Sequence, residues 1–320
     1  MNISDRRQFL ATASGAVVTT ALSNSTGFAA SSPPRKMKID LVCGRIGVKA
    51  NQREEIDLAA RHGFESVGPE LNDLTYYSAD QVLELKAEMK EKNLVFGATG
   101  MPVEFRKDPE IFAQGLKKLP GQAAALRRSG VARIGTWIKP SSDDLTYMEN
   151  FRRHTSRLRE IGKILADQGL RFGLEYVGPK TLWASKRYSF VHSMAEMKDL
   201  LAAIDVPTMG LILDSWHWYT SHETGKDLLS LTQEQIVAVD LNDAPVGIRI
   251  DEQVDSKREL PAATGVIDIA TFLQSLNQIG YDGPVRAEPF NAALRKLPAE
   301  EAVAATAAAM KKAFSRAALL

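Results

Sequence analysis

Short apolar runs alternate with longer amphipathic segments along this chain, from residue 37 to its C-terminal end. This rhythm constrains the fold most, because the short runs have the length of buried strands and the longer segments carry apolar residues at helical spacing. Strands that alternate with helices favour right-handed βαβ crossovers and a parallel sheet. The sequence predicts strands over residues 37–43, 65–67, 94–99, 132–137, 171–177, 208–214, 235–241 and 284–288. It predicts helices over residues 53–62, 79–92, 109–128, 144–168, 194–203, 226–232, 268–278 and 298–318.

Residues 37–320 therefore hold eight strand–helix units. A (β/α)₈ barrel typically takes ~250 residues, which this stretch accommodates. Gly63, Gly130, Gly169 and Gly280 each follow a predicted helix, at the position where a left-handed C-cap favours glycine. A doubly wound, Rossmann-like sheet is the alternative, but no Gly-x-Gly-x-x-Gly motif follows the first predicted strand. The expected fold is α/β, a single TIM barrel over residues 37–320.

The first 36 residues are expected to lie outside the barrel. The segment 5–10, Asp-Arg-Arg-Gln-Phe-Leu, resembles a twin-arginine export motif, an apolar run follows at 11–22, and small residues at 27–30 offer a cleavage site. The apolar run is too short to remain in a bilayer as a spanning helix. Because twin-arginine signals are addresses read by a receptor, we expect a signal peptide over 1–30, a linker over 31–36, and a periplasmic or exported protein.

The composition argues against several classes of binding partner and cofactor site. The formal net charge is +1, from 40 basic and 39 acidic residues, so the sequence makes no electrostatic case for nucleic acid or membrane binding. Cys43 is the sole cysteine, which excludes an intrachain disulfide and a cysteine-rich zinc site. The composition is that of an ordinary globular protein.

Four of the predicted strands end in a carboxylate: Glu175, Asp214, Asp240 and Glu288. In an α/β barrel the C-terminal ends of the strands surround one pocket. A buried carboxylate is costly unless it is paired or bound to a metal, and four that converge would repel one another. The pattern therefore indicates a divalent metal site. A carboxylate-lined pocket without a metal is the alternative.

Three segments are specific enough to indicate a family. They are Gly-Leu-Glu at 173–175, Leu-Asp-Ser-Trp-His at 213–217, and the stretch 258–288, which contains Gly-Val-Ile-Asp at 265–268 and Gly-Tyr-Asp-Gly at 280–283. With these segments, residues 37–315 resemble the xylose isomerase-like barrel family of sugar phosphate isomerases and epimerases. The resemblance implies a divalent cation, and it assigns as ligands Glu175, Asp214, Asp240 and Glu288.

Position 240 departs from the family pattern. The family usually has histidine there, in a His-x-x-Asp sequence, whereas this chain reads Asp-Leu-Asn-Asp at 240–243. The change gives an all-oxygen ligand set, and hard oxygen ligands favour magnesium, manganese or calcium over zinc. Manganese or magnesium is therefore the expected metal, with cobalt and zinc left open.

The resemblance also implies a mechanism and substrate contacts. Glu175 and Glu288 would exchange a proton on a carbon next to a carbonyl that the metal holds. Four further residues match substrate contacts of the family or lie where they could face the pocket: His217, Arg258, Trp216 and His192. Glu70 and Lys139 follow the second and fourth predicted strands and are weaker candidates.

The sequence thus predicts an exported, metal-dependent isomerase or epimerase that acts on a small-molecule carbohydrate. A lyase or hydrolase of keto-glycosides would use the same proton abstraction. A carbohydrate-binding barrel without activity is an alternative from another class, and an apurinic endonuclease shares the fold but would need a basic DNA-binding face. Because relatives often form dimers or tetramers, the resemblance makes a homodimer or tetramer the expected assembly. We expect no nucleic acid or membrane partner.

Overall fold

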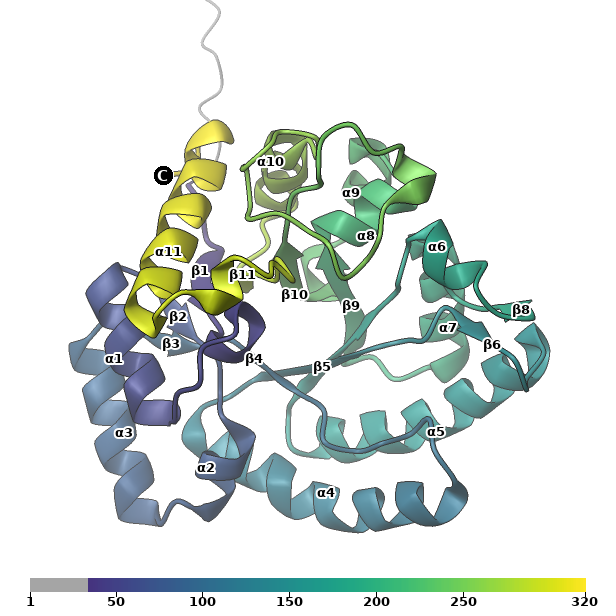
Figure 1. Cartoon of the computed structure of the whole chain (residues 1–320). Helices are drawn as coiled ribbons and strands as arrows, with labels where there is room; N and C mark the ends of the chain where they lie inside the picture. The colour runs from purple at the N-terminus through teal and green to yellow at the C-terminus, as the bar shows by residue number, and fades with distance from the viewer. Residues whose placement is uncertain (1–33) are drawn as a thin grey trace, which may run out of the picture. The chain divides into compact units, whose positions relative to one another are not determined.

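In the computed structural model, which describes residues 34–320, a sheet of parallel strands is surrounded by helices (Figure 1). The strand order is β3-β2-β1-β11-β10-β9-β7-β5-β4. Its two end strands, β3 (Val95–Phe96) and β4 (Ala98–Gly100), are consecutive pieces of one segment that is interrupted at Gly97. The nine strands therefore fill eight positions of a nearly closed barrel, and the predicted TIM barrel is confirmed.

The regular elements follow the predicted rhythm closely. The remaining barrel strands are β1 (Lys38–Leu41), β2 (Ser66–Val67), β5 (Arg133–Trp137), β7 (Arg171–Glu175), β9 (Met209–Asp214), β10 (Ile236–Leu241) and β11 (Pro284–Ala287). The helices that match a prediction are α1 (Gln52–His62), α3 (Ala79–Glu91), α4 (Pro109–Ser129), α5 (Tyr147–Asp167), α7 (Met194–Ile204), α9 (Gly225–Leu229), α10 (Ile269–Ile279) and α11 (Ala299–Arg316).

Several short elements were not predicted, and nearly all lie in loops that follow the C-terminal ends of barrel strands. They are η1 (Cys43–Ile46), α2 (Leu71–Tyr76), β6 (Ser141–Ser142), α6 (Lys180–Trp183), β8 (Tyr188–Ser189), α8 (Ser215–Thr220), η3 (Ile250–Glu252) and η4 (Leu294–Lys296). A further 3-10 turn, η2 (Gln233–Gln235), precedes β10. Each spans two to six residues, which is too short to show a hydrophobic period.

Residues 1–33, with the expected signal peptide and the first half of the expected linker, lie outside the described residues. Within residues 34–320, no helix combines the length and the apolar character that a membrane span requires.

The centre of the barrel is filled by one large side chain opposite two glycines. Ile212 forms a buried apolar cluster with Ala98 and Ala238. A Cβ atom at Gly173 would lie 2.7 Å from Ile212 Cγ1, and one at Gly135 would overlap its Cδ1. Because interiors are packed to the density of organic crystals, strands β5 and β7 need glycine at these positions to leave room for Ile212.

A layer of charged side chains also lies inside the barrel. The strand register puts Arg286 of β11 beside Asp40 of β1 and Asp240 of β10. Asp40 accepts a hydrogen bond from Ser66 Oγ at 2.7 Å, and Gly97 leaves space for it, since a Cβ there would lie 2.6 Å from its carboxylate oxygens. The interruption of the third strand thus coincides with the need to admit a carboxylate.

Helix α1 fixes the turn η1, which carries Arg45 towards the barrel mouth. The Cys43 N–H donates to Glu55 Oε1 at 2.5 Å. Glu55 is fully buried, and burial raises the pKa of its carboxyl to about 8, with further contributions from Glu70 and Asp40. At neutral pH the Glu55 carboxyl is therefore mostly protonated while its oxygen still holds the turn.

Replacing Glu55 with glutamine should change how stability depends on pH. The raised pKa means that the folded state binds a proton that the unfolded state releases above about pH 4.3. Stability from Glu55 is therefore complete below that pH and is lost as pH rises to about 8, by ~1.4 kcal/mol per pH unit at most. Glu55→Gln keeps the acceptor for Cys43 and should show a shallower loss between pH 5 and 8 in urea denaturation. Parallel pH profiles for the two proteins would contradict this reading.

Candidate active site

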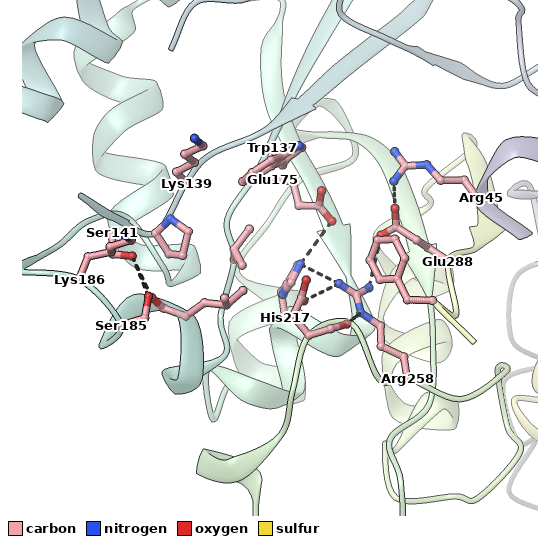
Figure 2. A pocket seen from close by; sticks show the side chains of 15 residues that line it. Arg45, Trp137, Lys139, Ser141, Glu175, Ser185, Lys186, His217, Arg258 and Glu288 are labelled. Atoms are coloured by element: carbon pink, nitrogen blue, oxygen red, sulfur yellow. Dashed lines mark hydrogen bonds and ion pairs between the residues drawn. The ribbon is translucent and has the colours of Figure 1, made fainter. Parts of the chain in front are cut away.

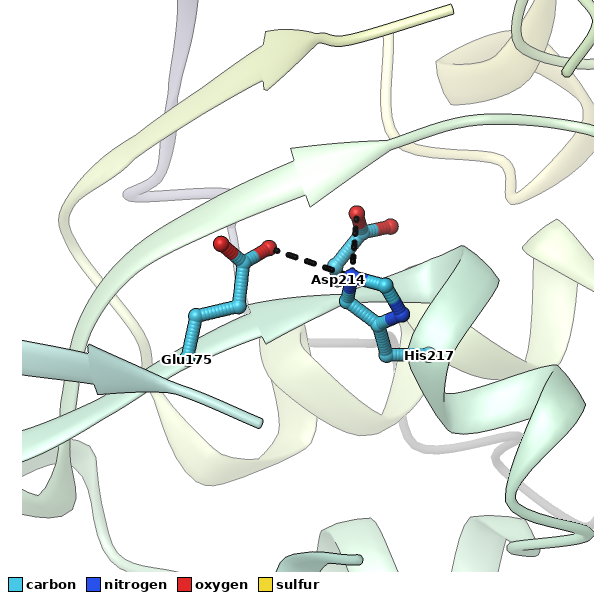
Figure 3. Close-up of side chains that lie close together, drawn as sticks. All are labelled: Glu175, Asp214 and His217. Atoms are coloured by element: carbon cyan, nitrogen blue, oxygen red, sulfur yellow. Dashed lines mark ion pairs between the residues drawn. The ribbon is translucent and has the colours of Figure 1, made fainter. Parts of the chain in front are cut away.

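The four carboxylates that end predicted strands meet at the C-terminal mouth of the barrel. Glu175, Asp214 and Asp240 lie at or near the ends of β7, β9 and β10, and Glu288 follows β11 directly. All four are buried. Oxygens of Glu175, Asp240 and Glu288 lie within 4.8 Å of one another, and so do ligand atoms of Glu175, Asp214 and His217 (Figure 3). The structure therefore brings together the predicted metal ligands, whose roles stay predictions.

Two arginines from the loops neutralise part of this charge. Arg258 Nη1 donates to Asp214 Oδ2 at 2.7 Å and to Glu288 Oε2 at 3.3 Å, and Nη2 donates to Asp255 Oδ1 at 2.7 Å. Burial would lower the pKa of Arg258, but Asp214 and Asp255 outweigh it and raise that pKa. Arg45 forms an ion pair with Glu288 (Figure 2). Both cations stay charged next to the site because they face carboxylates.

A third arginine holds Asp240, the position where the family resemblance leads us to expect histidine. Arg286 Nε donates to Asp240 Oδ1 at 2.5 Å and Nη2 donates to Oδ2 at 3.0 Å. Burial disfavours the charged carboxylate, yet Arg286 and Arg45 together lower the pKa of Asp240. Both Asp240 oxygens are thus engaged by one guanidinium fork. Asp214 is engaged as fully, since its Oδ1 accepts from the Trp216 N–H and from Asn242 Nδ2, and its Oδ2 accepts from Arg258.

Glu175 is the least satisfied carboxylate of the group. Its Oε1 atom is buried without a hydrogen-bond partner among residues 34–320, and His217 Nε2 lies 3.7 Å from it. Burial, then repulsion from Asp240 and Asp214, raise its pKa well above the usual value. A buried carboxylate in this state needs a proton or a cation. Carboxylate oxygens fit a hard divalent ion, and Glu175 Oε1 is left without a hydrogen bond among residues 34–320, so Glu175 with Asp214 and Glu288 could hold one.

His217 presents an N–H to the site rather than a lone pair. Its Nδ1 accepts a hydrogen bond from the Gly178 backbone N–H at 3.2 Å. Burial lowers the pKa of His217, which favours the neutral ring. The bond from Gly178 favours the hydrogen on Nε2, whereas Arg258 Nη2, which can only donate, lies 3.5 Å from the same nitrogen. That nitrogen lies 3.7 Å from both Glu175 Oε1 and Asp214 Oδ2 (Figure 3). In this tautomer, assigned from the hydrogen bond to Gly178, His217 is suited to donate to a substrate oxygen.

A cavity of about 440 Å³ opens beside these residues, within the size range of small-molecule sites (Figure 2). Strand ends and the long loops 178–192 and 242–266 supply its walls. The residues that line it are Arg45, Trp137, Lys139, Pro140, Ser141, Glu175, Val177, Leu182, Ser185, Lys186, His217, Asp255, Arg258, Glu288 and Phe290. The two loops are tied together by Lys180 Nζ with Asp251 Oδ2 at 3.0 Å and by Thr181 Oγ1, which donates to the Gln253 carbonyl at 2.8 Å.

Two predicted substrate contacts lie away from this cavity. Trp216 is fully buried and its ring lies under Arg258, whose guanidinium carbon is 5.3 Å from the ring centroid, while Phe290 lies 4.6 Å from the same carbon. His192 stacks on Trp183 with ring centroids 4.7 Å apart. Neither Trp216 nor His192 lines the cavity. Trp216 therefore supports Arg258 from beneath, and direct contact of either residue with substrate stays a prediction.

Sequence reasoning missed Arg45 and Arg286. Arg286 could have been found, because it precedes Glu288 by two residues in a predicted strand and alternation puts both side chains on one face. Arg45 lies in a four-residue turn that carries no periodic signal. Of the weaker candidates, Lys139 lines the main cavity and Glu70 lines a separate recess.

Removing Arg286 alone should destabilise the protein strongly. Arg286→Met leaves Asp240 as a buried charge without its partner, which costs about 3–5 kcal/mol. The double variant Asp240→Asn, Arg286→Met should recover much of that loss because no isolated charge remains. Urea denaturation of the two single variants, the double variant and the parent, with chelator present to remove any metal contribution, gives the coupling energy. Additive losses in this cycle would argue against a tight pair.

Comparisons with known proteins bear on this site. The model of the xylose isomerase-like TIM barrel family matches residues 56–313. An inosose isomerase of Bacillus velezensis is 24% identical over 79% of this chain and 89% of its own length. A 3-dehydroshikimate dehydratase of Pseudomonas aeruginosa is 31% identical over 79% of this chain but only 38% of its own length.

The fold has close counterparts among solved structures. A xylose isomerase domain protein from Alicyclobacillus acidocaldarius superposes with a TM-score of 0.76 and 29% identity, over 88% of this chain and 99% of that one. The family match covers most of the barrel, including all four carboxylates at the strand ends. This chain belongs to the xylose isomerase-like TIM barrel family.

Proposed function

We propose that this protein is a metal-assisted isomerase or epimerase that moves a proton next to the carbonyl of a carbohydrate or a cyclic polyol. The observation that carries the proposal is a pair of buried carboxylates, Glu175 and Glu288, which line one 440 Å³ cavity together with His217 and Arg258 (Figure 2). The inosose isomerase relative supports the reaction class.

The residues that line the cavity would each have a distinct role in this reaction. One of the two glutamates removes a proton from the substrate carbon and the other returns one, which requires a pKa raised towards neutrality, as burial raises that of Glu175. His217 donates Nε2–H to a substrate oxygen, and Arg258 offers positive charge as the oxygen gains negative charge. A divalent cation held by Glu175, Asp214 and Glu288 would polarise the substrate carbonyl as a Lewis acid.

Elimination is the second candidate reaction. Abstraction of a proton next to a carbonyl leads to loss of a β-substituent when a leaving group is present, and the same base then serves a lyase or dehydratase. The relative from Pseudomonas aeruginosa is named a dehydratase, which favours this alternative. Keto-glycosides would be the corresponding substrates for a lyase or hydrolase. Product analysis separates the two reactions, because epimerisation preserves the elemental composition and elimination does not.

Export remains a proposal that rests on the twin-arginine segment 5–10, which lies outside the described residues. We propose that the protein acts in the periplasm on a small molecule, without nucleic acid or membrane partners, as a homodimer or tetramer. The mass of the chain recovered from a periplasmic fraction tests the cleavage near residue 30.

Proton exchange is the direct test of the proposed function. Incubation of the protein with a panel of ketoses and inososes in deuterated water should introduce deuterium next to the carbonyl of the true substrate. Glu175→Gln and Glu288→Gln should each lower the exchange rate by about 10²–10⁴-fold, because neither amide can carry the proton. Glu91→Gln, on the exposed face of α3, is the matched control and should keep the parent rate. Full exchange activity in both site variants would refute the proposed mechanism.

Metal content provides a second test that does not depend on turnover. Protein purified without chelator should contain about one divalent cation per chain by mass spectrometry, because Glu175, Asp214 and Glu288 form an oxygen-rich site in which Glu175 Oε1 has no hydrogen bond among residues 34–320. Glu175→Gln and Asp214→Asn should lose most of it, whereas Glu91→Gln should retain it. Absence of metal, combined with no thermal stabilisation by added manganese or magnesium, would contradict the metal-assisted form of the proposal.

A further inference from the structure

A second recess of about 230 Å³ adjoins the main cavity and shares Arg45, Trp137 and Glu175 with it. Its lining carries three guanidinium groups, those of Arg45, Arg106 and Arg286, but a single carboxylate, that of Glu175. The charges that line the main cavity nearly cancel by comparison, because three carboxylates face its four cationic side chains. Positive charge therefore predominates among the residues that line the recess, although each arginine also pairs with a carboxylate outside this lining, Glu288, Glu104 or Asp240.

Arg106 is held rigidly in this recess. Its guanidinium carbon lies 4.2 Å from the Phe105 ring centroid and 4.7 Å from that of Trp137. Nη2 donates to Thr136 Oγ1 at 3.1 Å and to the Trp137 carbonyl, and Nη1 donates to Glu104 Oε1 at 3.3 Å. Its Nε is buried and has no hydrogen-bond partner among residues 34–320. A planar guanidinium that is stacked and only partly satisfied is preorganised to bind an anion.

The other two arginines contribute mainly their charge. Arg286 donates hydrogen bonds to Asp240 and, at 3.2 Å, to the Ala98 carbonyl. Arg45 pairs with Glu288, which lines the main cavity but not the recess. Burial lowers the pKa of Arg106, and an anion beside its guanidinium would offset this cost. The recess therefore attracts negative charge, and Arg106 supplies directed donors.

We propose that this recess binds a carboxylate of the substrate, so that the substrate is an acidic sugar or an acidic cyclic polyol rather than a neutral one. The inference rests on the proposed function in one respect, which is that the reacting carbon of the substrate lies near Glu175. Glu175 and Trp137 line both the main cavity and the recess, so a substrate bound there could reach both. A carboxylate and a phosphate could both accept from the guanidinium donors, and the probes described below distinguish them.

Paired probes that differ only in this group test the inference. D-glucuronate and D-glucose differ by a carboxylate in place of a hydroxymethyl group, and isothermal titration of the full chain measures the binding of each. The parent protein should bind glucuronate about tenfold more tightly than glucose, a difference of about 1.4 kcal/mol, because a hydrogen bond to a charged group is stronger than one to a hydroxyl. Added salt should reduce this preference, because screening weakens exposed charge interactions.

Variants at two adjacent positions separate local from general charge effects. Arg106→Gln should abolish the preference for glucuronate, and Arg106→Lys should keep part of it because the charge remains. Lys107→Gln is the matched control, since Lys107 is exposed, lines neither cavity and carries the same charge. Thermal denaturation identifies any variant that fails to fold. If Arg106→Gln does not fold, Arg106→Lys is compared with the parent protein instead.

Several outcomes would overturn the inference. They are equal binding of the two probes, no detectable binding of glucuronate, or an equal loss in Lys107→Gln. Tighter binding of glucose 6-phosphate than of glucuronate, with the same dependence on Arg106, would replace the carboxylate by a phosphate. Deuterium exchange into neutral ketoses with an unchanged KM in Arg106→Gln would support the proposed function and refute the acidic substrate, so the two failures are distinguishable.

Discussion

Coulomb repulsion among carboxylates buried at one end of the barrel is the constraint on which the other features of the site depend. A parallel barrel directs the C-terminal ends of its strands to one mouth, and here four of them bring an acidic side chain. Water cannot screen these groups, because all four are buried. Arg45, Arg258 and Arg286 form ion pairs with three of these carboxylates. Glu175 Oε1 has no hydrogen-bond partner among residues 34–320.

Each compensating arginine is fixed by a different part of the chain. Glu55 of α1 holds the turn that carries Arg45, and Trp216 and Phe290 pack against opposite parts of Arg258. Arg286 is anchored within the sheet itself, where the register places it next to Asp240. This division explains why residues far from the cavity, such as Glu55, bear on the geometry of the site. It also explains the acidic group at position 240: the register supplies Arg286 as its partner in the neighbouring strand.

The sequence was sufficient to predict the barrel, because most of the eight strand–helix units contain a helix long enough to show a clear hydrophobic period. It also located the four carboxylates, since each one ends an apolar run. The partners of these groups could not be read in the same way. Pairing of Arg286 with Asp240 depends on strand register, and the position of Arg45 depends on the turn η1, which has only four residues. The prediction that Trp216 contacts substrate stays untested, and what the sequence could not reveal is that its indole lies against Arg258.

The packing at the barrel centre has a consequence for how this sequence can diverge. Ile212 occupies space that Gly135 and Gly173 leave free on two neighbouring strands. A methyl group added at either glycine has no room unless the side chain at 212 becomes smaller, and a smaller side chain at 212 alone leaves a void. The side chains at these three positions, on three strands, therefore compete for the same space. Among descendants of this chain, accepted substitutions at 135, 173 and 212 should occur together rather than singly, independently of any selection on the chemistry at the mouth.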